Sequence, residues 1–126
     1  MDPKKRYVKH FIVTLVRFVL GIVLFVAGLA INVHSDHILR NLRAPGETGY
    51  KIPRGGAFEF VTAANYFGET LEWAGYAVAA AKPAALAFAA FTVLNLAPRA
   101  FSHHAWYRKK FENYPKNRKA YIPFIV

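Results

Sequence analysis

Several features common in enzymes are missing from this 126-residue chain. It contains no cysteine, which excludes disulfide bonds and a thiol nucleophile. It has no glycine-rich loop between a strand and a helix and no serine nucleophile elbow, so a Rossmann fold and serine nucleophile catalysis are excluded as well. Its five histidines are too few for the clustered motifs of membrane di-iron oxygenases, so no metal is expected.

Acidic residues are scarce, with 7 Asp and Glu against 17 Lys and Arg, yet 55% of the chain is hydrophobic. Long uncharged windows alternate with basic clusters, a pattern typical of an all-α, multi-pass membrane protein. Membrane lipids or a phosphorylated cofactor are therefore expected partners, and nucleic acid is not. We expect residues 1–10 to be a basic flank and residues 11–126 to be a membrane domain. The predicted spans are Phe11–Val33, Ala57–Ala81 and Ala84–Ala97, the last ended by Pro98 and followed by an amphipathic C-terminal helix.

The first span changes abruptly from apolar to polar in the stretch GLAINVHSDHILRNLR, residues 28–43. Donors and ionisable groups at the end of a membrane helix are costly in lipid, so they indicate a functional site where the membrane meets water. The loop that follows, Ser35–Arg54, is basic and contains two Gly-Pro-rich turns. A basic loop suits a phosphate group, and the positive-inside rule would explain the same charges without one.

Two further sets of polar residues lie at helical spacing. Asn65, Glu69, Glu72 and Tyr76 share one stripe of the second span, which favours a buried functional face over an amphipathic surface helix. The tail places Arg99, His103 and Tyr107 at positions i, i+4 and i+8. Cations suit phosphates, while amide and carboxylate groups suit ribose hydroxyls and a carboxamide. A nicotinamide dinucleotide phosphate would satisfy all of these groups together.

Three runs resemble the C-terminal half of the steroid 5α-reductase family, the 3-oxo-5α-steroid 4-dehydrogenases: INVHSDHILRNLRAPGETGYKIPRGG, ANYFGETLEWAGYA and AFSHHAWYRKKFENYPKNRKAYIPFIV. The resemblance implies part of a seven-helix membrane fold in the endoplasmic reticulum that uses NADPH. It implies a role in steroid and lipid metabolism, the reduction of the C4–C5 double bond of 3-oxo-Δ4 steroids. Matched by motif, the expected cofactor-binding residues are Asn32, Asp36, Arg43, Lys51, Asn65, Glu69, Arg99, His103 and Tyr107.

Two departures from the family pattern qualify this expectation. Lys51 stands where the family typically has arginine, which keeps the charge but weakens bidentate phosphate binding. The family's N-terminal half, with the Tyr and Glu that polarise the 3-oxo group, has no counterpart before Leu20. No catalytic residue is therefore assigned, and a partner chain that supplies the missing half is expected. The alternative is a non-catalytic membrane protein that binds a nucleotide or a partner reductase.

Overall fold

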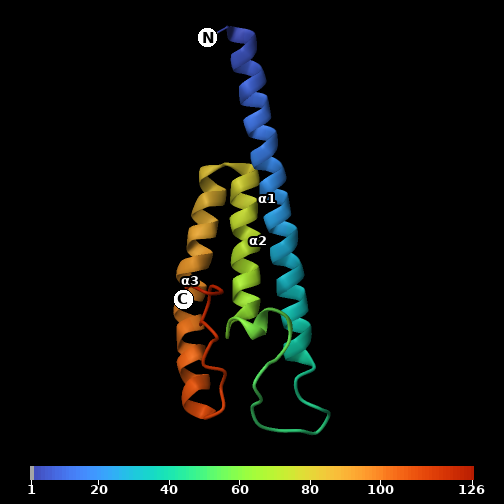
Figure 1. The fold of residues 1–126 in the computed structure, drawn as a ribbon, viewed down its shortest axis with the longest axis vertical. Helices are drawn as coiled ribbons and strands as arrows, with labels where there is room; N and C mark the ends of the chain where they lie inside the picture. Colours follow the sequence, from blue (N-terminus) through green and yellow to red (C-terminus); the bar gives the residue numbers. More distant parts are fainter. Residues whose placement is uncertain (1) are drawn as a thin grey trace.

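The computed structural model describes residues 2–126, which fold into helices joined by loops (Figure 1). Helix α2 (Ala64–Ala80) and helix α3 (Pro83–Lys110) form an antiparallel hairpin beside helix α1 (Pro3–Arg40), and a short 3-10 helix, η1 (Gly56–Glu59), precedes α2. Within residues 2–126 no strand forms, and one isolated parallel bridge joins Val61 to Lys119. The predicted all-α fold is confirmed.

Helix α1 is much longer than the hairpin beside it, and its N-terminal half projects past the turn between α2 and α3 (Figure 1). Pro3 occupies the first turn, and the Asp2 side chain caps it by accepting a hydrogen bond from the Lys4 amide at 3.2 Å. By length and composition α1 and α3 can each cross a membrane, and the apolar side chains along the projecting half of α1 are exposed. Helix α2, with 17 residues, measures only about 26 Å, slightly less than the hydrocarbon core.

Glycines bring α1 and α2 into backbone contact along the membrane part of the molecule. A Cβ atom on Gly28 would lie 2.3 Å from the Glu72 nitrogen, and one on Gly75 would lie 2.4 Å from the Phe25 nitrogen. Gly21 and Gly68 are equally close to the opposite backbone, at 2.4 Å and 2.6 Å. Both helices therefore depend on small residues seven positions apart, which is how membrane helices pack closely without a hydrophobic driving force.

The second predicted span begins later than expected, at Ala64 instead of Ala57. Gly55 and Gly56 have φ angles of +94° and +53°, which favour glycine and turn the chain into η1. The next amides pair with the C-terminal tail: Thr62 N–H donates to Lys119 O at 2.8 Å, and Ala63 N–H donates to Ala120 O at 3.0 Å. Helix α2 starts only after these pairings because the tail holds the preceding backbone in an extended bridge.

The sequence predicted that Pro98 ends the third span, but Pro98 lies inside α3. Leu96 and Ala100, on either side of it, are buried in a core cluster with Ala63 and Tyr121. This packing holds the helix together across the one amide hydrogen bond that proline cannot make. The expected C-terminal helix is thus the second half of α3, so the apolar part of α3 and its histidines belong to one continuous element.

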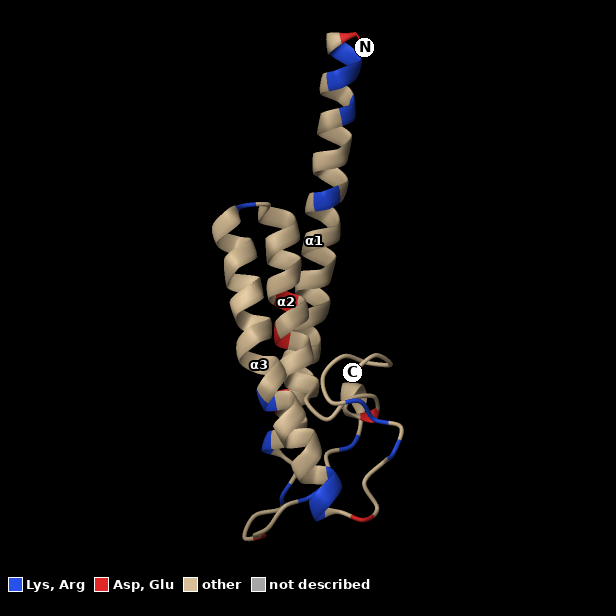
Figure 2. Cartoon of the chain, turned by 90° about the vertical axis from the view of Figure 1, so that its left-hand side faces the viewer, with Lys and Arg blue, Asp and Glu red and all other residues tan. Residues whose placement is uncertain are grey.

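The charged residues divide the molecule into polar ends and an apolar middle. Figure 2 shows Lys and Arg mainly at the tip of α1 and where the loop and the tail lie, and it shows Asp and Glu on α2, at the N-terminus and among the loops. The loop-and-tail end contains the C-terminal end of α1, the start of α2 and the second half of α3. The polar residues singled out from sequence come together mainly at this end.

Candidate functional site

A small cavity of about 160 Å³ lies where the first turn of α2 meets α3 and the loop. Three of the predicted residues, Asn65, His103 and Tyr107, line it. Asn65 comes from α2 and lies more than thirty residues before His103 and Tyr107 of α3. The other lining residues are mostly apolar or aromatic: Leu39, Pro53, Phe58, Thr62, Ala63 and Tyr66.

A second, more open pocket of about 350 Å³ shares His103 and Tyr107 with the first and adds Tyr50 and Trp106. The rings of Tyr50 and Trp106 meet edge to face with centroids 4.8 Å apart, and the guanidinium carbon of Arg43 lies 5.9 Å from the Tyr50 centroid. The two pockets therefore adjoin at His103 and Tyr107, and together they are called the depression, with aromatic side chains along it and a cation at its edge. Such a surface suits a planar ring attached to an anionic group.

The remaining predicted residues lie around this depression, and none of them is among its lining residues in the described part of the chain. The Asn32 backbone contacts the position of Gly68, which lies between Asn65 and Glu69 in α2. Asp36 is exposed and forms an ion pair with Arg40 at 2.9 Å, and Arg99 is exposed one turn before His103. The structure thus brings Asn32, Asn65 and Glu69 to one level of the bundle and leaves Asp36 and Arg99 near its surface.

Lys51, the predicted loop cation, is engaged by an acidic neighbour. Its ammonium group pairs with the carboxylate of Glu47 four residues earlier, and both side chains are partly exposed. The hydrogen bond from Lys51, together with its charge, lowers the pKa of the Glu47 carboxyl group. Lys51 is therefore held on the loop by this pair and is available to a ligand only in competition with Glu47.

The polar stripe of α2 has different surroundings along its length. Glu72 is only 9% exposed, and its backbone packs against Gly28 of α1, so α2 is not an amphipathic surface helix. Farther along, Tyr76 joins Trp73 and Phe88 around an apolar hollow of about 310 Å³, completed by Ala84 and Ala85. The ring of Trp73 meets Phe88 edge to face at 4.9 Å. One face of α2 thus runs from the polar depression toward an aromatic hollow between α2 and α3.

Arg118, in the tail, was not identified from the sequence. Its side chain is buried, yet its three nitrogen atoms have no hydrogen-bond partner among residues 2–126. The nearest carboxylate, that of the half-exposed Glu59, is 3.7 Å away, and the guanidinium lies 5.3 Å from the ring centroid of Tyr114. Tyr114 in turn stacks on Tyr107 at 5.4 Å. A buried guanidinium with unused hydrogen-bond donors therefore lies behind the stacked rings of Tyr107 and Tyr114, where its charge can attract an anion.

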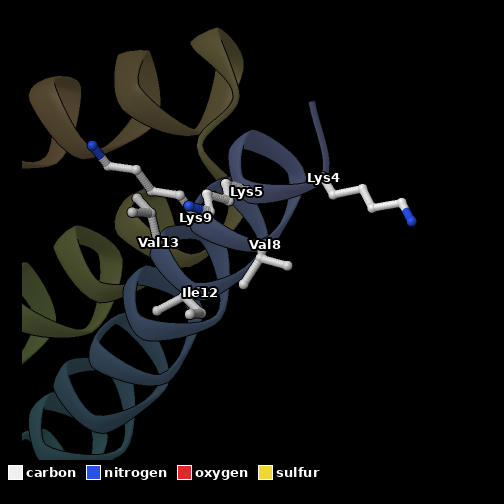
Figure 3. Close-up of a pocket in the computed structure, with 6 residues that line it drawn as sticks. All are labelled: Lys4, Lys5, Val8, Lys9, Ile12 and Val13. Atoms are coloured by element: carbon white, nitrogen blue, oxygen red, sulfur yellow. The ribbon is translucent and has the colours of Figure 1, made fainter. Parts of the chain in front are cut away.

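A further hollow of about 400 Å³ lies far from these groups, at the free end of α1 (Figure 3). It is a groove on the surface of one helix, and its side chains offer cations and apolar groups only, without an acid or a base. It therefore lacks the convergent polar groups of a binding site. Its lining residues are Lys4, Lys5, Val8, Lys9, Ile12 and Val13.

Comparison with known proteins decides the family. The family model described as 3-oxo-5-alpha-steroid 4-dehydrogenase matches residues 4–126. The chain belongs to this family. It is 58% identical to 3-oxo-5-alpha-steroid 4-dehydrogenase 1 of Macaca fascicularis over 97% of its own length and 49% of that relative.

Two human members of the 3-oxo-5-alpha-steroid 4-dehydrogenase family are similarly close. The chain is 62% identical to the type 1 protein of Homo sapiens over 86% of this chain and 42% of that protein. It is 57% identical to the type 2 protein over 87% of this chain and 43% of that protein. The chain therefore spans about half the length of the curated relatives it matches, and the family resemblance of the three motifs is confirmed.

Proposed function

We propose that this chain forms the NADPH-binding half of a steroid 5α-reductase of the endoplasmic reticulum membrane. The observation that carries the proposal is the depression where Asn65, His103 and Tyr107 meet, with Arg43 at its edge and Arg118, whose hydrogen-bond donors are unused, behind its aromatic side chains. Its donor set fits a dinucleotide phosphate, which needs cations for phosphates, polar groups for ribose and carboxamide, and aromatic faces for rings.

The residues divide into roles by their chemistry. Arg43 and Lys51 would bind phosphate groups, Arg118 would attract them from behind the rings of Tyr107 and Tyr114, and Arg99 adds a cation at the rim. Imidazole and phenol groups of His103 and Tyr107 would donate or accept hydrogen bonds inside the depression. When bound, the cofactor supplies hydride for the reduction. The remaining proposed contacts, to hydroxyl and carboxamide groups, are Asn32, Asp36, Asn65 and Glu69.

The apolar hollow between α2 and α3 is the proposed place for one face of the steroid. Trp73 lies one helical turn beyond Glu69 on α2, so the hollow follows the polar depression along the same helix. Its aromatic rings and alanine methyl groups suit a flat, rigid apolar ligand. The substrate class proposed from this arrangement is a 3-oxo-Δ4 steroid, reduced at its C4–C5 double bond.

A polypeptide corresponding to the other half of the relatives is the proposed source of the groups that polarise the 3-oxo oxygen. The alternative is a non-catalytic membrane protein that binds a nucleotide or a partner reductase through the same site. Reduction of a 3-oxo-Δ4 steroid by membranes that contain this chain, with and without the other half of a relative, distinguishes the two. Product formed only when both halves are present supports the proposal, and none in either case favours the alternative.

Nucleotide binding can be tested separately from catalysis. We expect His103→Ala to weaken NADPH binding by about ten-fold or more, because it removes a hydrogen-bonding ring that lines both pockets. The measurement is the fluorescence of the nicotinamide ring on titration of the purified chain in detergent. Ser102→Ala is the matched control, since Ser102 is exposed and adjacent in the chain. Equal affinity in both variants would remove His103 from the site.

The pair between Glu47 and Lys51 predicts a gain of affinity. We expect Glu47→Gln to strengthen NADPH binding about two- to three-fold at low salt, because it frees the Lys51 ammonium group for a phosphate. The gain should shrink at 0.5 M salt, where exposed charges are screened. Glu112→Gln makes the same charge change at another exposed position and should have no effect. A gain in both variants would assign the effect to net charge alone.

A further inference from the structure

We propose that Thr62 is a positioning residue for the cofactor-binding depression, an inference that rests on the proposed function. Its hydroxyl group joins His104 of α3 to Tyr114 of the tail. His103 and Tyr107, the site residues of α3, are one residue before and three residues after His104. By holding His104, Thr62 therefore sets where these two side chains stand relative to Asn65.

The geometry at Thr62 is close and buried. Its Oγ1 atom lies 2.6 Å from His104 Nδ1 and 2.7 Å from the Tyr114 hydroxyl oxygen, and the residue is 5% exposed. A threonine hydroxyl can donate one hydrogen bond and accept two, so it can serve both partners at once. The Thr62 amide is fixed as well, by its hydrogen bond to Lys119 O at 2.8 Å. Thr62 is thus anchored through its backbone and holds two other elements through its side chain.

The end of α3 depends on this link. Within residues 2–126, the bond from Thr62 to His104 is the only side-chain hydrogen bond between α3 and another part of the chain, and the backbone bonds that leave α3 are those at its own two ends. The other contacts near this end are apolar or aromatic, such as the Tyr66 and His103 rings at 5.8 Å. Such contacts are non-directional and permit small shifts or rotations. The directional bond from Thr62 selects one rotation of the turn that presents His103 and Tyr107.

Thr70, which lies within α2, provides a matched comparison. Its hydroxyl group also bonds to a tail tyrosine, Tyr121, so it holds the tail with the same chemistry as Thr62 but makes no bond to α3. Neither Thr70 nor Tyr121 is among the residues lining the depression in the described part of the chain. Loss of the Thr70 hydroxyl should therefore weaken the fold without moving the site, whereas loss of the Thr62 hydroxyl should do both.

The test compares NADPH binding to the purified full chain in detergent for three variants. We expect Thr62→Val, which keeps the shape and removes the hydroxyl, to bind about ten-fold more weakly. Thr62→Ser, which restores the hydroxyl, should bind within about two-fold of the original chain. Thr70→Val should bind NADPH like the original chain. If Thr62→Val does not fold, His104→Leu and His104→Asn replace the first two variants, because asparagine keeps a hydrogen-bonding group near the Nδ1 position.

A second readout does not require nucleotide binding. In a Trp73→Phe background Trp106 is the only tryptophan, and it lies in the aromatic pocket beside Tyr50. Acrylamide should quench the fluorescence of Trp106 more strongly when Thr62→Val is added, and the quenching should stay unchanged when Thr62→Ser is added. A chain that binds no NADPH yet shows this quenching pattern would refute the proposed function and retain the positioning role. Unchanged quenching and binding in Thr62→Val, or an equal loss in Thr62→Ser, would overturn the positioning role.

Discussion

Replacing Gly28 by leucine is expected to separate α1 from α2 and to lower the free energy of unfolding by about 3 kcal/mol or more. Any Cβ atom at this position would lie 2.3 Å from the Glu72 nitrogen and 2.6 Å from the Gly68 oxygen. Both are backbone atoms, so no change of side-chain rotamer can relieve the clash. The helices must move apart, and the contacts at Gly21, Gly28, Gly68 and Gly75, which together form the glycine seam, all weaken.

Thermal unfolding of the purified chain in detergent measures this effect, with Ala27→Leu as the control. Ala27 precedes Gly28 and is exposed, so the same leucine there meets lipid or detergent instead of α2. We expect the control to keep the unfolding temperature of the original chain within a few degrees. A Gly28→Leu variant as stable as Ala27→Leu would mean that the two helices do not pack through this seam.

Arg118→Met is expected to have opposite effects on stability and on binding. Without nucleotide the variant should be as stable as the original chain or more stable, because it removes a buried charge whose donors are unpaired. Glu59 loses its partner at little cost, since its side chain is 48% exposed. NADPH binding should weaken by about 1 kcal/mol, or about five-fold, because a cation behind the rings of Tyr107 and Tyr114 no longer attracts the phosphates.

Unfolding temperatures with and without NADPH reveal both effects in one experiment, since a ligand stabilises in proportion to its affinity for the folded state. The original chain should show a clear rise on addition of NADPH, and Arg118→Met should show a smaller one. Lys116→Met is the control, because it removes an exposed cation from the same tail. Lower stability of Arg118→Met without nucleotide, combined with an unchanged NADPH shift, would make Arg118 a structural residue only.

The helices of this fold were predictable from sequence because apolar runs of membrane length have few other stable forms. The prediction was wrong where distant parts of the chain meet. Residues 57–63 look apolar enough to extend α2, but the amides of Thr62 and Ala63 pair with the tail, and no local pattern encodes that pairing. Pro98 signals a break in the local sequence, whereas the burial of Leu96 and Ala100 on either side keeps α3 continuous.

Part of the site could be predicted from the sequence, because regular helical spacing shows which side chains share a face. Helical spacing predicted that His103 and Tyr107 share a face, and both line the depression with Asn65. Spacing could not predict the roles proposed for Thr62 and Arg118, because each depends on how the irregular tail returns to the start of α2. The burial of the Arg118 guanidinium, which leaves its hydrogen-bond donors unused, likewise depends on the tertiary structure and has no signal in the sequence.

The glycine contacts between α1 and α2 also fix how far the two helices are shifted along each other, and so fix the position of the polar site. Gly21 meets Gly75 and Gly28 meets Gly68, so both helices carry the same seven-residue interval. A slip of one interval, about 10 Å, would break both pairs, leave one new glycine pair (Gly28 with Gly75, or Gly21 with Gly68) and set the other two glycines against larger residues. A single alignment therefore retains both pairs, and in that alignment Asn32 of α1 stands level with Asn65 and Glu69 of α2. The packing of the apolar segment thus decides which polar groups face each other outside it.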